Sequence, residues 1–342
     1  MKVKGFVRSR MRESRTYGSV RGGYRKVSIY SIVEMVRNGI PKINCIRFGV
    51  LASRERRRMI EKEIIKSKYG NIAAYKKGAG PKTILLLHGA GCDSTMLSWR
   101  EVFKALSDDF TVYAFDFLGY GRSDKADELV GDHFFDTHID CVKCVATHYG
   151  LTDIALAGLS MGGAIAIGFA LRYPDMVKAL IPVDTWGVSE KMPFHHLSYW
   201  YVKHTDLTLT QYRWCAKFRW LAKWSISYAL IGNKKLITDA LVDEVMQSCA
   251  GDMAGKSMLN FQRSSADKDQ SQPCYLGELK NLKMPVIYII GEKDPLVPLS
   301  DIYKAAGENP NSRVEVFEGC KHWSVKEQPW KFCRIVSLVF DQ

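Results

Sequence analysis

The chain has 342 residues, 46% of them hydrophobic and 25% charged, which is the balance of a folded globular protein and excludes a wholly disordered chain. The net charge of +13 is concentrated at one end, because residues 1–68 carry 19 Lys and Arg against 5 Asp and Glu. No apolar run approaches the roughly 20 residues that span a bilayer. Nine scattered cysteines favour free thiols in a reducing, intracellular compartment, most simply the cytoplasm.

The basic N-terminal segment is interpreted as an extension. Residues 1–60 are expected to be partly helical or disordered, with a helix from about residue 52 to 66. The Arg- and Ser-rich, acid-poor start is similar to an organelle transit peptide, which is the alternative to a cytoplasmic location. The charge makes the segment a candidate for contact with anionic lipid or nucleic acid, against the simpler interpretation of a solvated tail. No nucleic-acid partner is expected for the rest of the chain.

Strand and helix patterns alternate from residue 69 onward, which is typical of a parallel sheet covered by helices on both faces. The alternation stops where a stretch rich in Trp and Tyr takes a helical pattern. We therefore expect an α/β core of residues 61–185 and 281–342, interrupted by a helical lid over 186–280. The predicted strands are 71–75, 83–87, 111–115, 154–157, 179–183, 286–290 and 314–317, and the predicted core helices are 134–149, 162–172 and 330–340.

Ser160 is the predicted nucleophile. It lies in Gly158-Leu159-Ser160-Met161-Gly162, which matches G-x-S-x-G, directly follows an apolar strand and opens a helix of small residues. A sharp strand-to-helix turn exposes a serine, and small neighbours let the two elements approach. The pattern alone can occur by chance, so its position between strand and helix carries the prediction.

A serine hydroxyl needs a base to take its proton and an acid to orient that base. His322 and Asp294 both follow predicted strands, and the order Ser, Asp, His is the one expected for this turn type. Asp184, directly after the strand 179–183, is the alternative acid. It would otherwise be a structural residue at the lid hinge.

The developing oxyanion needs two hydrogen-bond donors held on rigid backbone. His88-Gly89-Ala90-Gly91 follows the first long strand, and its glycines let the loop approach the nucleophile. We expect the backbone N–H groups of Ala90 and Met161 to form the oxyanion hole.

These features together resemble the α/β-hydrolase superfamily over residues 69–342. The segment from Asp116 to Ser123 is similar to the D-x-x-G-x-G-x-S stretch that follows strand four in that family, where it is structural. The resemblance implies an α/β fold with a mostly parallel eight-stranded sheet, helices on both faces and a lid inserted after strand six.

The expected activity is hydrolysis of a carboxylic ester, thioester or lactone through a Ser-His-Asp triad and an acyl-enzyme. The aromatic lid favours a small-molecule substrate with an apolar acyl or aryl group. A carbon–carbon bond hydrolase, a cofactor-free haloperoxidase-like enzyme and a ligand-sensing protein with little turnover remain alternatives, because relatives with each role share these motifs. No cofactor or metal is expected, since the pairs Cys141/Cys144 and His195/His196 lack further ligands nearby.

Overall fold

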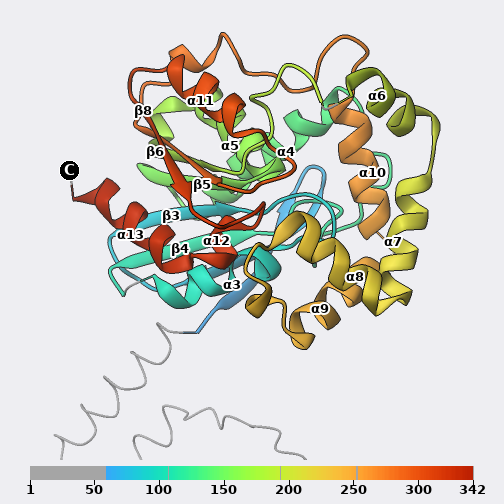
Figure 1. The fold of residues 1–342 in the computed structure, drawn as a ribbon. Helices are drawn as coiled ribbons and strands as arrows, with labels where there is room; N and C mark the ends of the chain where they lie inside the picture. Colours follow the sequence, from blue (N-terminus) through green and yellow to red (C-terminus); the bar gives the residue numbers. More distant parts are fainter. Residues whose placement is uncertain (1–58, 107, 193, 252, 342) are drawn as a thin grey trace, which may run out of the picture. The chain divides into compact units, whose positions relative to one another are not determined.

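The computed structural model describes residues 59–106, 108–192, 194–251 and 253–341 (Figure 1). Eight strands form one sheet in the order β1-β2-β4-β3-β5-β6-β7-β8. The β1–β2 and β2–β4 pairs are antiparallel and the other five pairs are parallel, as the sequence predicts for a mostly parallel sheet. The strands are β1 (Glu61–Ser67), β2 (Gly70–Lys77), β3 (Lys82–Leu87), β4 (Phe110–Phe115), β5 (Ile154–Leu159), β6 (Val177–Val183), β7 (Val286–Gly291) and β8 (Ser312–Phe317).

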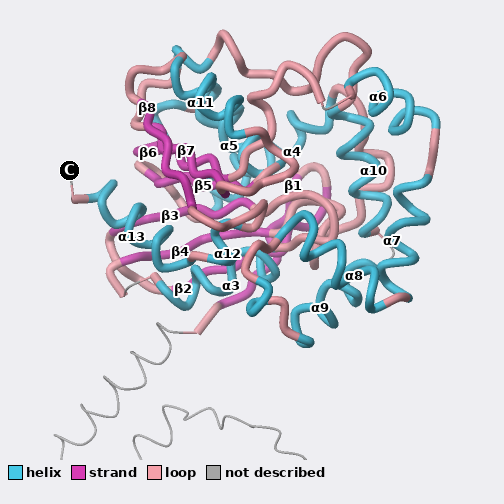
Figure 2. Tube along the Cα trace, in the orientation of Figure 1, coloured by secondary structure: helices cyan, strands magenta, loops and turns pink. Residues whose placement is uncertain are grey.

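Helices cover both faces of the sheet (Figure 2). The apolar side chains of α4, α5 and α11 pack on one face, and those of α3, α12 and α13 pack on the other. The bounds of these helices are α3 (Thr95–Ala105), α4 (His133–His148), α5 (Met161–Arg172), α11 (Leu299–Gly307), α12 (Ser324–Glu327) and α13 (Pro329–Phe340).

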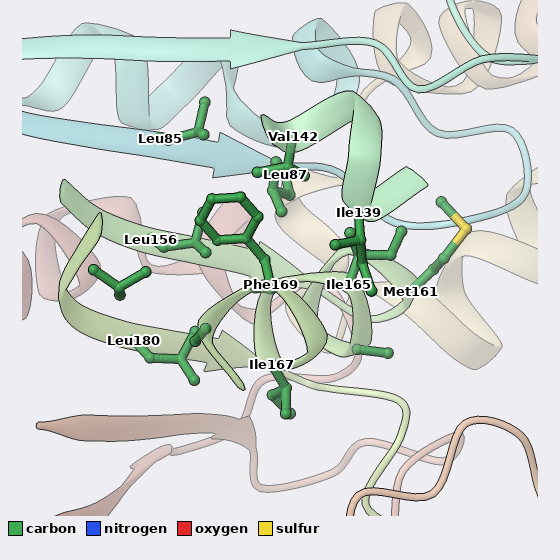
Figure 3. Packing of buried hydrophobic residues seen from close by; sticks show 14 of the residues in the cluster. Leu85, Leu87, Ile139, Val142, Leu156, Met161, Ile165, Ile167, Phe169 and Leu180 are labelled. Carbon is green, nitrogen blue, oxygen red and sulfur yellow. The ribbon is translucent and has the colours of Figure 1, made fainter. Parts of the chain in front are cut away.

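Strand β3 illustrates why helices must lie on both sides. Leu85 and Leu87 point into the cluster under α4 and α5 (Figure 3), whereas Ile84 and Leu86 point into the cluster under α3 and α13. All four side chains are fully buried. Because successive side chains alternate between faces, a continuous apolar strand buries itself only when both faces are covered.

The N-terminal edge of the sheet differs from the prediction. Residues 61–66 were expected to end a helix, but Glu61–Ser67 is strand β1, paired along its whole length with β2. The expected helical residues 52–58, like the rest of the N-terminal extension, lie outside the described residues. Only Ile65 of β1 is buried, so the strand carries almost no apolar alternation and is specified by its antiparallel partner.

A group of helices separates β6 from β7. Its members are α6 (His195–His204), α7 (Leu207–Lys217), α8 (Arg219–Ser225), the π-helical turn η2 (Ile226–Leu230), the 3₁₀ turn η3 (Lys234–Leu236), α9 (Asp239–Ala250) and α10 (Ala254–Ser265). We call residues 194–265 the helical insertion. Figure 1 shows it beside the sheet, with α7 next to α10. Among the described residues, no helix is long and apolar enough to pass through a bilayer.

Candidate active site

Ser160 occupies the turn between β5 and α5, with φ of 52° and ψ of −116°. Positive φ is strained for a residue with a Cβ, and it turns the side chain out of the strand–helix junction. The backbone is anchored on both sides: Ser160 N donates to Val183 O at 2.9 Å, and Ser160 O accepts from Trp186 N at 3.1 Å. The backbone at and just after the end of β6 therefore holds Ser160 in position at the end of β5.

The glycines of this turn are required by close backbone contacts. A Cβ on Gly158 would lie 2.1 Å from the carbonyl oxygen of Gly162, and a Cβ on Gly162 would lie 2.4 Å from that of His88. Such contacts are far shorter than real carbon–oxygen contacts. The small residues of the motif thus let β5, α5 and the loop after β3 approach one another.

His322 and Asp294 are brought together by loops after β8 and β7. His322 Nδ1 and Asp294 Oδ2 are 2.7 Å apart, and the two side chains are 7% and 1% exposed. Asp294 Oδ1 accepts from the backbone N–H groups of Leu296 and Val297, which fixes the carboxylate. Burial by itself lowers the pKa of His322, but the charge and hydrogen bond of Asp294 outweigh burial, and the pKa is raised above its usual value.

Asp184, the alternative acid, lies behind this pair and is fully buried. Its Oδ1 accepts from Gly291 N at 2.7 Å, and its Oδ2 accepts from Ser324 Oγ at 2.6 Å. Asp184 therefore joins the end of β7 to the start of α12, on either side of the His322 loop. Burial, followed by the nearby charge of Asp294, raises the pKa of Asp184.

The loop before α12 also rests on the helical insertion. Trp323 N donates to Leu230 O at 2.9 Å, and Lys321 Nζ donates to Ser227 O at 2.6 Å and Tyr228 O at 2.8 Å. These acceptors belong to η2, at the C-terminal end of its helix, where the last carbonyl groups have no partner within the helix. The insertion thus helps to place His322, which no sequence motif indicated.

The loop after β3 carries the proposed oxyanion donor Ala90. His88 Nε2 accepts a hydrogen bond from Phe117 N at 3.0 Å, so the ring proton is on Nδ1. This Nδ1–H donates to Gly89 O at 2.7 Å. Ala90 lines the cavity described below. Met161 is the first residue of α5, so its N–H has no partner within the helix.

Asp93 is a buried carboxylate in the same loop that the sequence analysis missed. Its Oδ2 accepts from Gly89 N at 2.8 Å and from Ser98 Oγ at 2.5 Å, which ties the loop to helix α3. Burial raises the pKa of Asp93. No spacing rule marks an aspartate five residues after His88, and only its position beside Gly89 shows its role in shaping the loop.

The segment after β4 is structural, as the resemblance implies. Asp116 Oδ1 accepts from Thr95 N at 2.9 Å, and Oδ2 accepts from Tyr75 Oη and Arg122 N. A Cβ on Gly121, which has φ of 53°, would lie 2.2 Å from Asp116 Oδ2. Asp116 therefore holds the loops at this end of the sheet without facing the cavity.

Ser160, Ala90 and His322 line one cavity of about 770 Å³ between the core and the helical insertion. Its wall is mainly apolar and aromatic, with Trp186, Trp200, Tyr212, Met258, Phe261 and Trp323 among the large side chains. Among the described residues, neither Lys nor Arg lines it, and Asp93 and His322 are its titratable side chains apart from Tyr and Cys. Such a cavity is suited to an uncharged apolar group.

The histidine and cysteine pairs considered as metal ligands lie in surroundings that do not form a metal site among the described residues. His195 is buried, and its ring nitrogens contact Met192 N at 3.3 Å and Lys268 O at 3.2 Å. Cys141, on α4, is buried in the core, and all eight cysteines among the described residues are free thiols. Within the part of the chain that the structure describes, no group of three His, Cys, Asp or Glu side chains is placed to hold a metal ion.

A serine on a strained strand–helix turn, with an Asp–His pair on loops after two later strands of a mostly parallel sheet, has the architecture of an α/β-hydrolase. A family model for the alpha/beta hydrolase fold matches residues 82–329, so the chain belongs to that family. The predictions of the superfamily, of the eight-stranded fold and of a hydrolase are confirmed.

Individual relatives are hydrolases of several kinds. A 2-hydroxy-6-oxononadienedioate/2-hydroxy-6-oxononatrienedioate hydrolase from Burkholderia vietnamiensis is 26% identical over 269 residues, covering 76% of this chain and 87% of the relative. A serine hydrolase from a Cycloclasticus species that degrades polyaromatic hydrocarbons has a similar fold, with a TM-score of 0.67, 20% identity and coverage of 83% and 98%. A thermophilic esterase from Thermogutta terrifontis matches with a TM-score of 0.61, 21% identity and coverage of 83% and 98%.

Proposed function

We propose that this chain is a serine hydrolase that cleaves a carboxylic ester, thioester or lactone with an uncharged apolar acyl or aryl group. The observation that carries the proposal is that Ser160 and the Asp294-bound His322 open onto the same apolar cavity. A covalent acyl-enzyme mechanism requires this combination of nucleophile, base and substrate-sized space.

In the proposed mechanism, Ser160 Oγ attacks the substrate carbonyl while His322 Nε2 takes the hydroxyl proton. Asp294 keeps His322 in the tautomer that carries its proton on Nδ1 and stabilises the imidazolium that forms. The backbone N–H groups of Ala90 and Met161 bind the oxyanion. His322 then protonates the leaving group, and a water molecule activated by His322 hydrolyses the acyl-enzyme.

We further propose that the helical insertion acts as the lid over this site and that residues 61–185 and 281–342 form the catalytic core. The insertion supplies Trp200, Tyr212, Met258 and Phe261 to the cavity wall, and η2 supports the His322 loop. The lid would therefore set both the shape of the acyl pocket and the position of the base.

Hydrolysis of a carbon–carbon bond is the second candidate, because the Burkholderia relative is a hydrolase of a dienedioate. A dioate carries two carboxylates, and buried carboxylates require cationic or multiple hydrogen-bond partners. The described lining of this cavity offers Asp93 but neither Lys nor Arg, which favours an uncharged substrate. This contrast is why we prefer the ester, thioester or lactone.

Hydrolysis of p-nitrophenyl esters with short, medium and long acyl chains tests the proposal. We expect turnover in the wild-type protein, a preference for acyl chains longer than acetyl, and loss of turnover in Ser160→Ala. Tight binding of such esters without turnover would instead indicate a ligand sensor. Cleavage of a carboxylated dienoate in preference to every neutral ester would indicate the carbon–carbon hydrolase.

A further inference from the structure

Seven of the ten exposed large aromatic side chains among the described residues belong to the helical insertion. Trp220, Trp224 and Tyr228 follow one another at four-residue intervals along α8 and η2, and each is more than half exposed, Trp220 by 69%. Residues four apart share one side of a helix. The rings of Trp224 and Tyr228 stack with their centroids 5.2 Å apart and their planes 8° from parallel. We call Trp220, Trp224 and Tyr228 the aromatic stripe.

A second set of exposed apolar residues belongs to the active-site cavity itself. Phe194, Leu197, Trp200 and Leu296 line the cavity and are also exposed to solvent, Phe194 by 85%. Residues that meet both conditions form the rim of the opening. Leu230, two residues after Tyr228, also lines the cavity, so η2 carries both the last residue of the stripe and part of the cavity wall. The opening is therefore bordered by apolar surface on the insertion.

The charge of this part of the insertion is strongly one-sided. Residues 194–238 contain seven Lys and Arg and a single acidic residue, Asp206. Arg213, Lys217 and Lys223 are exposed, and none of them takes part in the salt bridges found among the described residues. The chain from residue 69 to 342 as a whole carries 30 Lys and Arg against 31 Asp and Glu, so this cationic character is local.

Protein surfaces that bind in the headgroup region of a membrane typically expose Trp and Tyr beside Lys and Arg. We propose that the aromatic stripe and the rim of the cavity dock on an anionic lipid surface, so that the cavity opens toward the lipid. A second copy of the chain is a poorer occupant, because the same face on both copies would bring like charges together. The docking does not depend on catalysis. It rests on the proposed function in one respect: the substrate that docking brings to the cavity is an ester embedded in the lipid.

Co-flotation with vesicles tests the proposal in the full-length protein. Vesicles of phosphatidylcholine alone are compared with vesicles that also contain phosphatidylglycerol. We expect binding to the anionic vesicles and weaker binding at high salt. The triple variant Trp220→Ala/Trp224→Ala/Tyr228→Ala and the triple variant Arg213→Gln/Lys217→Gln/Lys223→Gln are each expected to lower the partition coefficient about tenfold or more.

Matched controls separate docking from general hydrophobicity and charge. Trp330 and Tyr303 are exposed aromatics on α13 and α11, away from the insertion, so Trp330→Ala/Tyr303→Ala should bind as the wild type does. Lys280→Gln/Lys283→Gln serves as the charge control. The basic residues 1–58 are the same in every variant, so any binding they contribute cancels in the comparison.

Repeating the assay in Ser160→Ala keeps docking apart from catalysis, because docking should persist when hydrolysis is lost. Circular dichroism and the thermal unfolding temperature of each variant show whether the fold is kept, and the two triple variants test the same face independently. Wild-type binding by both triple variants would overturn the proposal. It would also be overturned if the wild-type protein failed to bind anionic vesicles and instead formed dimers that the stripe variant abolished.

Discussion

His322 Nδ1 lies 2.7 Å from Asp294 Oδ2, although the two residues are 28 positions apart and follow different strands. The second buried aspartate of this region, Asp184, is hydrogen-bonded to Gly291 and Ser324 instead. This division of contacts gives the two carboxylates different expected roles.

The first prediction compares Asp294→Asn with Asp184→Asn. Asp294→Asn removes the acceptor that orients His322, so we expect kcat to fall by about three to four orders of magnitude while the thermal unfolding temperature changes little. Asp184→Asn places an amide NH₂ among buried donors, so we expect the free energy of unfolding to fall by about 1–3 kcal/mol. Ester turnover and thermal denaturation measure the two effects. Equal losses of kcat without destabilisation of Asp184→Asn would contradict the assignment.

The second prediction concerns pH. His322 must be neutral to accept the proton of Ser160, and its raised pKa moves the loss of activity in acid to a pH above its ordinary value of 6.5. Asp294 raises this pKa, so Asp294→Asn should shift the acid limb of the rate profile to lower pH. The rate of serine labelling by a fluorophosphonate, followed from pH 5 to pH 9, measures the limb even when turnover is slow. An acid limb at the same pH in Asp294→Asn as in the wild-type protein would show that the Asp294 carboxylate does not raise the pKa of His322.

The third prediction tests the packing of the nucleophile turn. A methyl group on Gly162 would lie 2.4 Å from His88 O, a backbone atom that cannot move away alone. We expect Gly162→Ala to lose about 3 kcal/mol or more of the free energy of unfolding, measured by urea denaturation. A methyl group on Gly307, at the end of α11, would meet no neighbouring element within 4 Å, so Gly307→Ala should be close to neutral. Equal stability of the two variants would refute the tight approach.

The fourth prediction concerns strain at the nucleophile itself. Ser160 has a positive φ, a conformation that glycine adopts without steric cost. Ser160→Gly should therefore be more stable than Ser160→Ala by up to about 1 kcal/mol, after allowing for the greater flexibility of glycine in the unfolded chain. Thermal unfolding of both inactive variants measures the difference. Greater stability of Ser160→Ala would show that the turn is not strained.

The central strands and the order of the site residues could be predicted because their signals are local. β5 and β7 are continuous apolar runs, and Ser160 and Asp294 follow their ends. His322 follows β8, whose valines alternate with charged residues. A parallel sheet places the carboxyl ends of its strands at one edge, which makes a shared site predictable from separate motifs.

Other features depend on tertiary contacts that no local pattern encodes. Strand β1 has one buried residue and takes its conformation from pairing with β2, so its sequence alone wrongly predicts the end of a helix. The contacts between Lys321 and η2 join segments more than 90 residues apart. Asp93 contacts residues close to it in the sequence, Gly89 and Ser98, but only the folded path of the loop shows that its carboxylate binds them. Contacts of this kind can be identified only from the folded structure.

The central claim is that Ser160 is a nucleophile activated by His322. Incubation with a fluorophosphonate probe followed by mass spectrometry of the labelled peptide tests it most directly. We predict a single modification on Ser160 in the wild-type protein, none in Ser160→Ala, and labelling slowed by several orders of magnitude in His322→Ala. An unlabelled wild-type Ser160, or a labelling rate unchanged by His322→Ala, would contradict the account.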